Sequence, residues 1–191
     1  MFEHLKAKFP FPKTKCVRFI REFKRIEVPA KTILLKENEV SLHAYYIEKG
    51  LARAWYNNDG KDVTFQFFTE NTMFSSLESF RKGLPSMVSF ETIEPCILWK
   101  IDKPTVDRIL AEIYNDPELR DRFMDSVFER TFDYMKHFFS FIKDSPQQRY
   151  LDLAKEKPEI IKRVPQHYIA SYLGITTVHL SRIKAKILKG G

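Results

Sequence analysis

Short apolar segments separated by turn residues fill the chain from Arg25 to Asp102. The segments are rich in β-branched and aromatic residues, and they read RIEVPA, KTILLKE, HAYYIEKG, LARAWYNNDG, KDVTFQFFTEN, MVSFETIE and CILWKID. Gly50 and the run NNDG, which ends at Gly60, are tight-turn sequences because Asn, Asp and Gly tolerate positive φ. Many short strands at regular spacing predict a β-sandwich, barrel or roll.

Helices are predicted on both sides of this region. Residues 1–24 are expected to form short helices, with Val17, Ile20 and Phe23 at helical spacing. Residues 105–142 are also expected to be helical, with Pro117 marking a break and the start of a long helix.

The long helix carries two adjacent apolar stripes, each with spacings of three and four residues. The first stripe consists of Phe123, Val127, Thr131, Tyr134, Phe138 and Phe141, and the second of Met124, Phe128, Phe132, Met135, Phe139 and Ile142. A surface helix normally shows one stripe of about 100°. Two stripes along a helix of roughly 36 Å need cover from more than one neighbour. One alternative is a single helix buried in a monomer core. We favour a dimer in which one stripe lies on the β domain and the other on a second copy of the helix.

A helical pattern resumes after the sequence KDSPQQ. Ser145 is predicted to cap a helix that has Pro146 at its first position and ends near Pro158. The sequence RVPQ starts the next helix, with Pro165 in its first turn.

The stretch YIASYLGITTVHLSRI raises the question why a helical pattern contains Gly174, since glycine inside a helix costs about 1 kcal/mol relative to alanine. Counted from Gln166, the fifth residue is Ala170 and the ninth is Gly174. The fourth, eighth, tenth, fifteenth and eighteenth residues are apolar, namely Ile169, Leu173, Ile175, Leu180 and Ile183. This register predicts a helix-turn-helix, in which the fifth residue is small where the helices cross and the ninth takes a left-handed backbone. The alternative is an accidental helical hairpin. We expect Thr176 to cap a second helix from about Thr177 to Leu188.

The charge distribution along the chain indicates a class of binding partner. The chain has 191 residues and a net charge of +7, and residues 141–191 hold ten Lys/Arg and four Asp/Glu. A basic C-terminal module attracts polyanions, with DNA or RNA first among them. The alternative is a solvated basic tail.

Composition limits the remaining classes of protein. No apolar run approaches the roughly 18 residues of a membrane span, and the N-terminus does not have the pattern of a signal peptide. Cys16 and Cys96 are too few for a disulfide framework, which favours a cytoplasmic location.

Three motifs then follow one another in a specific order: QRYLDL at 148–153, VPQHYIASYLGIT at 164–176 and LSRI at 180–183. With these motifs the chain resembles the Crp/Fnr family of transcription regulators, in particular a short branch. The resemblance implies an α+β fold with an antiparallel β-roll (a jelly roll of the cyclic-nucleotide-binding type), a long dimerisation helix and an all-α helix-turn-helix domain. The expected bounds are 1–116 for the sensor domain with its N-terminal helices, 117–142 for the dimerisation helix and 143–191 for the DNA-binding domain. The sequence stops at Gly191, so the β-hairpin wing usual after the motif is not expected.

The resemblance also implies a function, namely a dimeric, sequence-specific regulator that binds a palindromic operator in double-stranded DNA, with RNA polymerase as a further partner. The implied DNA-binding residues are Gln166, Thr176, Thr177, Val178, His179, Ser181, Arg182, Lys184 and Lys186. Arg182 is the main candidate for reading a base, because a guanidinium pairs with guanine through two hydrogen bonds. Lys184, Lys186 and Lys189 are better placed for phosphates. Thr177 and Val178 stand where the best-known members have an Arg–Glu pair, so the target sequence does not carry over.

The sensor half departs from the cyclic-nucleotide pattern of the family. That pattern has a Gly-Glu pair and an Arg-Ser pair, and the matching positions here are Ser75-Ser76 and Ser86-Met87. We therefore expect no cyclic nucleotide, and the effector stays open. The candidate pocket residues are Ser75, Ser76, Glu78, Ser86 and Thr131, and the alternative is that they are ordinary loop residues.

Two other classes of protein compete with the regulator. A metal-binding β-barrel enzyme needs clustered His and carboxylate ligands, and His43 stands alone on its predicted strand. We therefore expect no enzyme, no metal and no cofactor. A small-molecule-binding or protein-interaction module that has lost specific DNA binding is the remaining alternative.

Overall fold

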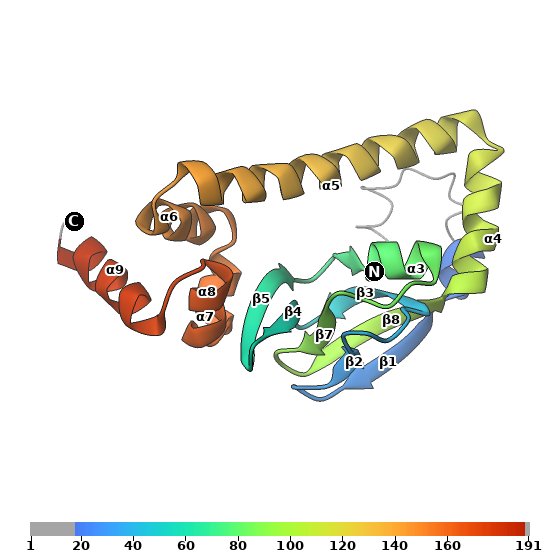
Figure 1. Cartoon of the computed structure of the whole chain (residues 1–191). Coiled ribbons are helices and arrows are strands. Elements are labelled where there is room, and N and C mark those ends of the chain that lie inside the picture. The colour runs from blue at the N-terminus through green and yellow to red at the C-terminus, as the bar shows by residue number, and fades with distance from the viewer. Residues whose placement is uncertain (1–17, 190–191) are drawn as a thin grey trace. The chain divides into compact units, whose positions relative to one another are not determined.

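The computed structural model describes residues 18–189 of the chain. Val17 and Cys16 lie outside the described residues, and residues 18–21 are helical. The chain divides into two compact units, and Figure 1 labels the helices and strands that belong to them. The first consists of Met1–Arg53 and Phe68–Phe132, and the second of Ala54–Phe67 and Asp133–Gly191. A hairpin of the β-region is therefore grouped with the C-terminal helices.

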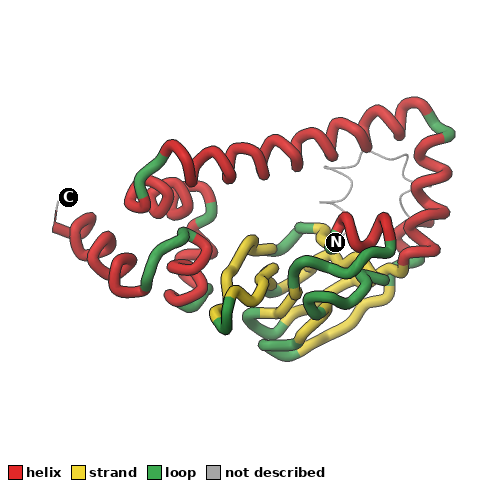
Figure 2. The backbone as a smooth tube through the Cα atoms, viewed as in Figure 1, coloured by secondary structure: helices red, strands yellow, loops and turns green. Residues whose placement is uncertain are grey.

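Two four-stranded antiparallel sheets form the β-roll, in the orders β1-β8-β3-β6 and β2-β7-β4-β5. The strands are β1 (Lys24–Val28), β2 (Ile33–Leu35), β3 (His43–Lys49), β4 (Ala52–Asn58), β5 (Lys61–Phe68), β6 (Met73–Phe74), β7 (Ser89–Thr92) and β8 (Cys96–Asp102). Each predicted apolar segment contains one of them, and only the two-residue β6 was not predicted. The α+β fold class is confirmed, with strands before α4 and helices alone after it (Figure 2).

Alternating apolar residues of the strands form the core of the roll. Ile47 of β3 lies opposite Leu98 of β8, and both side chains are fully buried. Phe74 stacks on Phe68 with ring centroids 4.5 Å apart and meets the edge of Phe90 at 5.2 Å. Aromatic pairs in these geometries contribute about 0.5–1.5 kcal/mol beyond their buried area.

Gly50 links β3 to β4 in the turn that the sequence predicts. Its φ is +106°, and a Cβ at this position would lie 2.5 Å from the sulfur of Cys96. Glycine is required here both by the backbone conformation and by the close approach of β8.

Two helices follow the strands, α4 two residues earlier than the predicted start at residue 105 and α5 at the predicted Pro117. Helix α4 (Lys103–Tyr114) is capped by Asp102, whose side chain accepts a hydrogen bond from the backbone of Thr105 at 2.9 Å. This bond lowers the pKa of Asp102. Helix α5 (Pro117–Lys143) starts at the predicted proline. Helix α3 (Leu77–Lys82) was not predicted; Gly83, which has φ +71°, caps its C-terminus.

Four further helices follow in the second unit: α6 (Pro146–Glu156), α7 (Pro158–Arg163), α8 (Gln166–Tyr172) and α9 (Thr177–Lys189). Ser145 caps α6 as predicted, because its hydroxyl accepts from the Gln148 backbone at 3.2 Å. The short helix α7 was not predicted, and Pro165 is the N-cap of α8 rather than part of its first turn.

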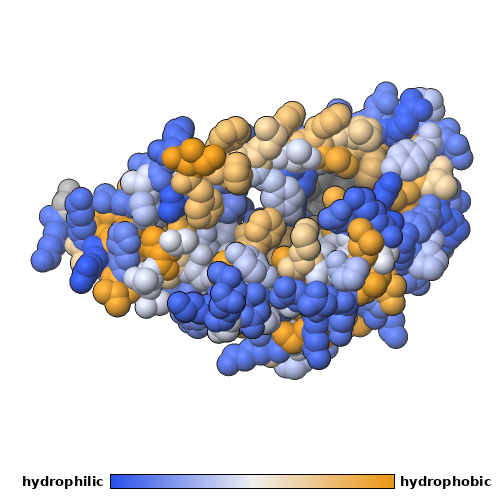
Figure 3. Space-filling model, viewed as in Figure 1, coloured by the Kyte–Doolittle hydropathy of each residue, from blue (hydrophilic) through white to orange (hydrophobic). Residues whose placement is uncertain are grey.

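The two stripes on α5 are exposed rather than buried in a monomer core. Leu119 is the only buried residue among the described residues of this helix. Ten large apolar residues of the stripes are 37–69% exposed, namely Met124, Val127, Phe128, Phe132, Tyr134, Met135, Phe138, Phe139, Phe141 and Ile142. Figure 3 shows apolar side chains gathered along this helix. Both stripes are therefore largely exposed in the single chain.

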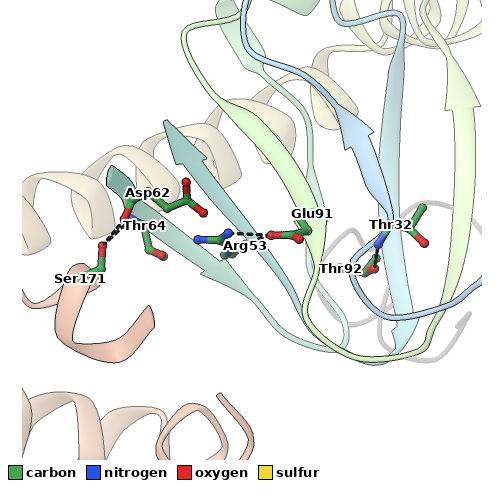
Figure 4. A network of polar contacts seen from close by, with 7 residues as sticks. All are labelled: Thr32, Arg53, Asp62, Thr64, Glu91, Thr92 and Ser171. Carbon is green, nitrogen blue, oxygen red and sulfur yellow. Dashed lines mark hydrogen bonds and ion pairs between the residues drawn. The ribbon is translucent and has the colours of Figure 1, made fainter. Parts of the chain in front are cut away.

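A buried ion pair joins β4 to β7 inside the first unit (Figure 4). The Arg53 guanidinium donates to Glu91 from Nε at 2.9 Å and from a terminal nitrogen at 2.7 Å. The Arg53 side chain is only 1% exposed and that of Glu91 is 12% exposed. A charge buried this deeply requires a partner, because its desolvation is costly.

The first prediction concerns this pair. Glu91→Leu should lower the free energy of unfolding by about 3–5 kcal/mol, because it leaves the Arg53 charge buried without this carboxylate. Adding Arg53→Met should restore much of the loss, because it removes the buried guanidinium charge. Urea unfolding at pH 7 measures both effects. The matched control is Glu27→Leu, which breaks an exposed pair with Arg25 and should cost less than about 1 kcal/mol. Equal losses for Glu91→Leu and Glu27→Leu would contradict the interpretation.

Candidate nucleic-acid interface

The turn between α8 and α9 has the geometry that the sequence register predicts. Gly174 has φ +67°, which is the left-handed conformation that glycine adopts at little cost. The N–H of Ile175 donates to the Ala170 carbonyl at 3.0 Å, and the N–H of Gly174 donates to the Ser171 carbonyl at 3.0 Å. This pair of bonds is a Schellman motif, which satisfies two carbonyls at the end of α8.

The start of α9 is capped as expected. The Thr176 hydroxyl accepts from the backbone N–H of His179 at 3.2 Å, and the Thr176 carbonyl accepts from Leu180 at 3.0 Å. The small and apolar positions of the register hold the two helices together. Five of them are at most 5% exposed, namely Ile169, Ala170, Leu173, Leu180 and Ile183, whereas Ile175 is half-buried.

The opposite face of α9 is exposed and carries the residues that were predicted to read bases. Val178, Ser181 and Arg182 follow the i, i+3, i+4 rule, so they share one face, and all three are exposed. Thr177 and His179 are also exposed and flank this face in the first turn. The positive end of the helix dipole adds to the attraction of this first turn for anions.

The lysines that were predicted to contact phosphates differ in their exposure and in their hydrogen bonds. Lys184 is half-buried, and its ammonium group donates to the Gln166 side chain at 3.2 Å, so two predicted DNA-binding residues contact each other. Lys186 and Lys189 are exposed on the last turns of α9.

Aromatic side chains join α8 to the end of α5 within the second unit. The ring of Tyr172 stacks on His137 with centroids 4.7 Å apart, and its hydroxyl lies 3.3 Å from Nδ1 of His137. His137 in turn meets the edge of Phe141 at 5.1 Å. Burial lowers the pKa of His137, with Lys157 and Arg149 as further causes, and burial also raises the pKa of Tyr172. Both groups are therefore neutral near pH 7.

Ser171 of α8 contacts the β4–β5 hairpin within the same unit (Figure 4). Its hydroxyl accepts from the Thr64 backbone at 2.9 Å and donates to the Asp62 carbonyl at 3.1 Å. Phe67 of β5 lies 5.0 Å from Tyr172, measured between ring centroids. Since β5 ends its sheet, Ser171 pairs two backbone groups that lack a neighbouring strand.

Sequence reasoning missed Ser171, His137 and Tyr172 as contact residues. Their contacts join elements that are distant in sequence, and no local pattern predicts such pairs. The only available signal was that Ser171 and Tyr172 lie inside the VPQHYIASYLGIT motif without an assigned role.

Two of the predicted pocket residues of the roll lie together. Ser86 is buried, and its oxygen is 2.8 Å from that of Ser76, 2.6 Å from the Val88 carbonyl and 3.2 Å from the Val88 nitrogen. Three protein groups therefore already satisfy the Ser86 hydroxyl. Ser75 is half-buried and adjoins Ser76 in the same loop.

The other two predicted pocket residues engage different partners. Glu78 is exposed and forms an i, i+4 ion pair with Lys82 along α3, at 2.7 Å. Thr131 is exposed on α5 and donates its hydroxyl to the Val127 carbonyl at 2.9 Å. Neither contact directs these side chains to the Ser76–Ser86 pair.

His43, the candidate of the metal-enzyme alternative, pairs with Asp102 across strands β3 and β8. Burial lowers its pKa, with nearby Lys100 as a further cause. Within residues 18–189, no three His, Cys, Asp or Glu side chains lie close enough to hold a metal ion. No helix in the same range is both long and apolar enough to cross a membrane.

Part of the chain matches a known protein family. Residues 25–113 match the cyclic nucleotide-binding domain family. No curated protein matches the sequence significantly.

Solved structures match nearly the whole fold. The c-di-GMP-responsive global regulator CLP of Xanthomonas campestris is 16% identical, with 94% of this chain and 93% of that chain covered and a TM-score of 0.72. FixK2 from Bradyrhizobium japonicum is 14% identical, with 88% and 86% covered and a TM-score of 0.70. The catabolite activator protein of Thermus thermophilus is 14% identical, with 95% and 85% covered and a TM-score of 0.56. The chain therefore has the fold of these regulators, which agrees with the fold that the resemblance to the Crp/Fnr family implies.

Proposed function

We propose that this chain is a dimeric, sequence-specific DNA-binding regulator whose β-roll does not respond to cyclic nucleotides. The observation that carries the proposal is the helix-turn-helix with an exposed α9 face, set in the segment that holds nearly all of the net positive charge. We also propose the functional division of the chain into a sensor (1–116), a dimerisation helix (117–142) and a DNA-binding domain (143–191). An operator in DNA and contact with RNA polymerase would place the protein in the cytoplasm.

The α9 helix is suited to the major groove at its N-terminal end. Arg182 lies one turn after Val178 on the exposed face, so a guanine and a thymine methyl group are the contacts that these two side chains favour. Lys186 and Lys189 supply positive charge for phosphates, which add affinity without sequence information.

The exposed stripes of α5 support the dimer. Monomeric proteins rarely expose apolar patches larger than about 300–600 Å². A second α5 is a partner of matching length and chemistry, because a two-fold axis brings the same apolar surface from each copy together. Two copies would also place two α9 helices on the half-sites of a palindrome.

The loop residues of the roll support a change of effector. Neutral Ser76 and Ser86 hydrogen-bond each other at positions where the resemblance implies a carboxylate and a guanidinium for cyclic nucleotides. CLP, which shares the fold, is described as c-di-GMP-responsive, so a regulator of this fold is not restricted to cyclic mononucleotides.

The second prediction tests base reading. Arg182→Ala should cost about 1–3 kcal/mol on the preferred operator and much less on random DNA, because it removes contacts to bases. Lys186→Ala is the control, and it should weaken both kinds of binding alike and flatten the salt dependence. A fluorescence titration at several salt concentrations measures both. Equal losses for Arg182→Ala on the two DNAs would remove its base-reading role. Wild-type binding without any sequence preference would favour the interaction-module alternative.

The third prediction tests the dimer. Phe138→Glu should give monomers or insoluble chains, because it places an unpaired charge in the proposed interface. Operator affinity should fall with dimerisation, because linked half-sites bind with avidity. Light scattering measures the mass. Glu129→Gln is the control on the same helix and should remain dimeric. A wild-type monomer at micromolar concentration would reject the dimer.

The fourth prediction concerns the effector. Charge-assisted contacts contribute about 1.5–3 kcal/mol each, so losing two lowers affinity by roughly two to four decades. Calorimetry with cyclic AMP and cyclic GMP should show no heat at micromolar protein. Saturable binding in that range, with a matching rise in operator affinity, would contradict this part of the proposal.

A further inference from the structure

We infer that Arg149 and Phe141 are positioning residues that fix the helix-turn-helix on the end of the long helix α5. The inference rests on the proposed function, because the orientation it fixes is that of the base-reading helix. All of the residues involved belong to the second compact unit.

Arg149 of α6 bridges the ends of two other helices. One terminal guanidinium nitrogen donates to the Asp144 carbonyl, directly after α5, at 2.8 Å. The other donates to the Leu173 carbonyl, directly after α8, at 2.9 Å. Carbonyls at helix C-termini lack intrahelical partners and carry partial negative charge, so one cation satisfies both ends. The fork of a guanidinium reaches two separate acceptors at once, whereas a lysine ammonium is a single point of charge.

Phe141 fills the space between Arg149 and the turn. The Arg149 guanidinium lies over its ring, 4.6 Å from the centroid. On the side of the turn, a Cβ added to Gly174 would lie 3.2 Å from Cε1 of Phe141. A residue larger than glycine would therefore strain the left-handed backbone and would also press closely on this ring.

These contacts act on the turn rather than on the DNA-facing residues. The Leu173 carbonyl that Arg149 holds lies directly before Gly174, and α9 begins three residues after Gly174. Nε of Arg149 is buried without a hydrogen-bond partner. Arg149 therefore leaves its Nε–H unsatisfied, while its two terminal nitrogens donate to the two carbonyls. These contacts therefore tie the turn before α9 to the end of α5, and in the proposed dimer this attachment influences the distance between the two reading helices.

The first measurement uses half-site spacing. An operator selected by the wild-type dimer from a palindromic library is altered so that its half-site spacing changes one base pair at a time. Arg149→Gln should lower affinity about tenfold at the preferred spacing, the scale of one lost charge-assisted hydrogen bond, and flatten the dependence on spacing. Arg149→Lys keeps the charge and should show the same flattening. Lys155→Gln removes an exposed charge from the same helix and should keep the wild-type profile. An unchanged profile for Arg149→Gln would overturn the inference.

The second measurement does not depend on DNA. Hydrogen exchange at the amides of Gly174 and Ile175 should be faster in Arg149→Gln than in Lys155→Gln, while exchange at Ile169 stays slow. Phe141→Ala should reduce the loss of stability caused by Gly174→Ala, because it removes the contact and leaves only the backbone strain. If the wild type binds no operator, the proposed function fails. These two measurements still test whether Arg149 and Phe141 attach the helix-turn-helix to the end of α5. Equal exchange in both charge variants, together with additive Phe141 and Gly174 effects, would overturn the inference.

Discussion

The left-handed backbone at Gly174 is the constraint on which the C-terminal unit depends. It ends α8 with a Schellman motif, and two residues later Thr176 caps α9. It also leaves room for Phe141, whose ring would lie only 3.2 Å from a Cβ at this position. The conformation of one residue therefore sets both the crossing of the two helices and their attachment to α5.

The second constraint is the uncovered surface of α5. A helix of 27 residues with one buried side chain among them does not pack in the manner of a core helix. Burying a Phe, Leu or Met side chain contributes about 1.5–3 kcal/mol, so a partner that covers several of them has a large driving force. The apolar stripes end at Phe141 and Ile142, and the guanidinium of Arg149 lies over the Phe141 ring. The surface of the proposed dimer therefore ends at the contacts that attach the Gly174 turn to α5.

Local patterns were enough to predict much of the fold. Strand segments, the proline at the start of α5, the Ser145 and Thr176 caps and the Gly174 turn each depend on neighbouring residues, so periodicity and capping chemistry predict them. Strand β6 and helices α3 and α7 have two to six residues, which is too short for a period to emerge. The Arg53–Glu91 pair and the bridge made by Arg149 join residues 38 and 24 positions apart, so only the folded chain brings them together. The base-reading and pocket roles stay predictions, because exposure and spacing define a surface but not its ligand.

The roll itself indicates why an effector pocket was hard to read from sequence. Residues of a loop acquire a binding role only if folding leaves their polar atoms unsatisfied and directed at a ligand. Here the Ser86 hydroxyl is satisfied by Ser76 and by both backbone groups of Val88, and the deeply buried Arg53 has Glu91 as its carboxylate. A phosphate that entered near either site would have to displace a protein partner and bear the cost of its desolvation. The internal pairing of these groups therefore supports the proposal that the roll does not respond to cyclic nucleotides.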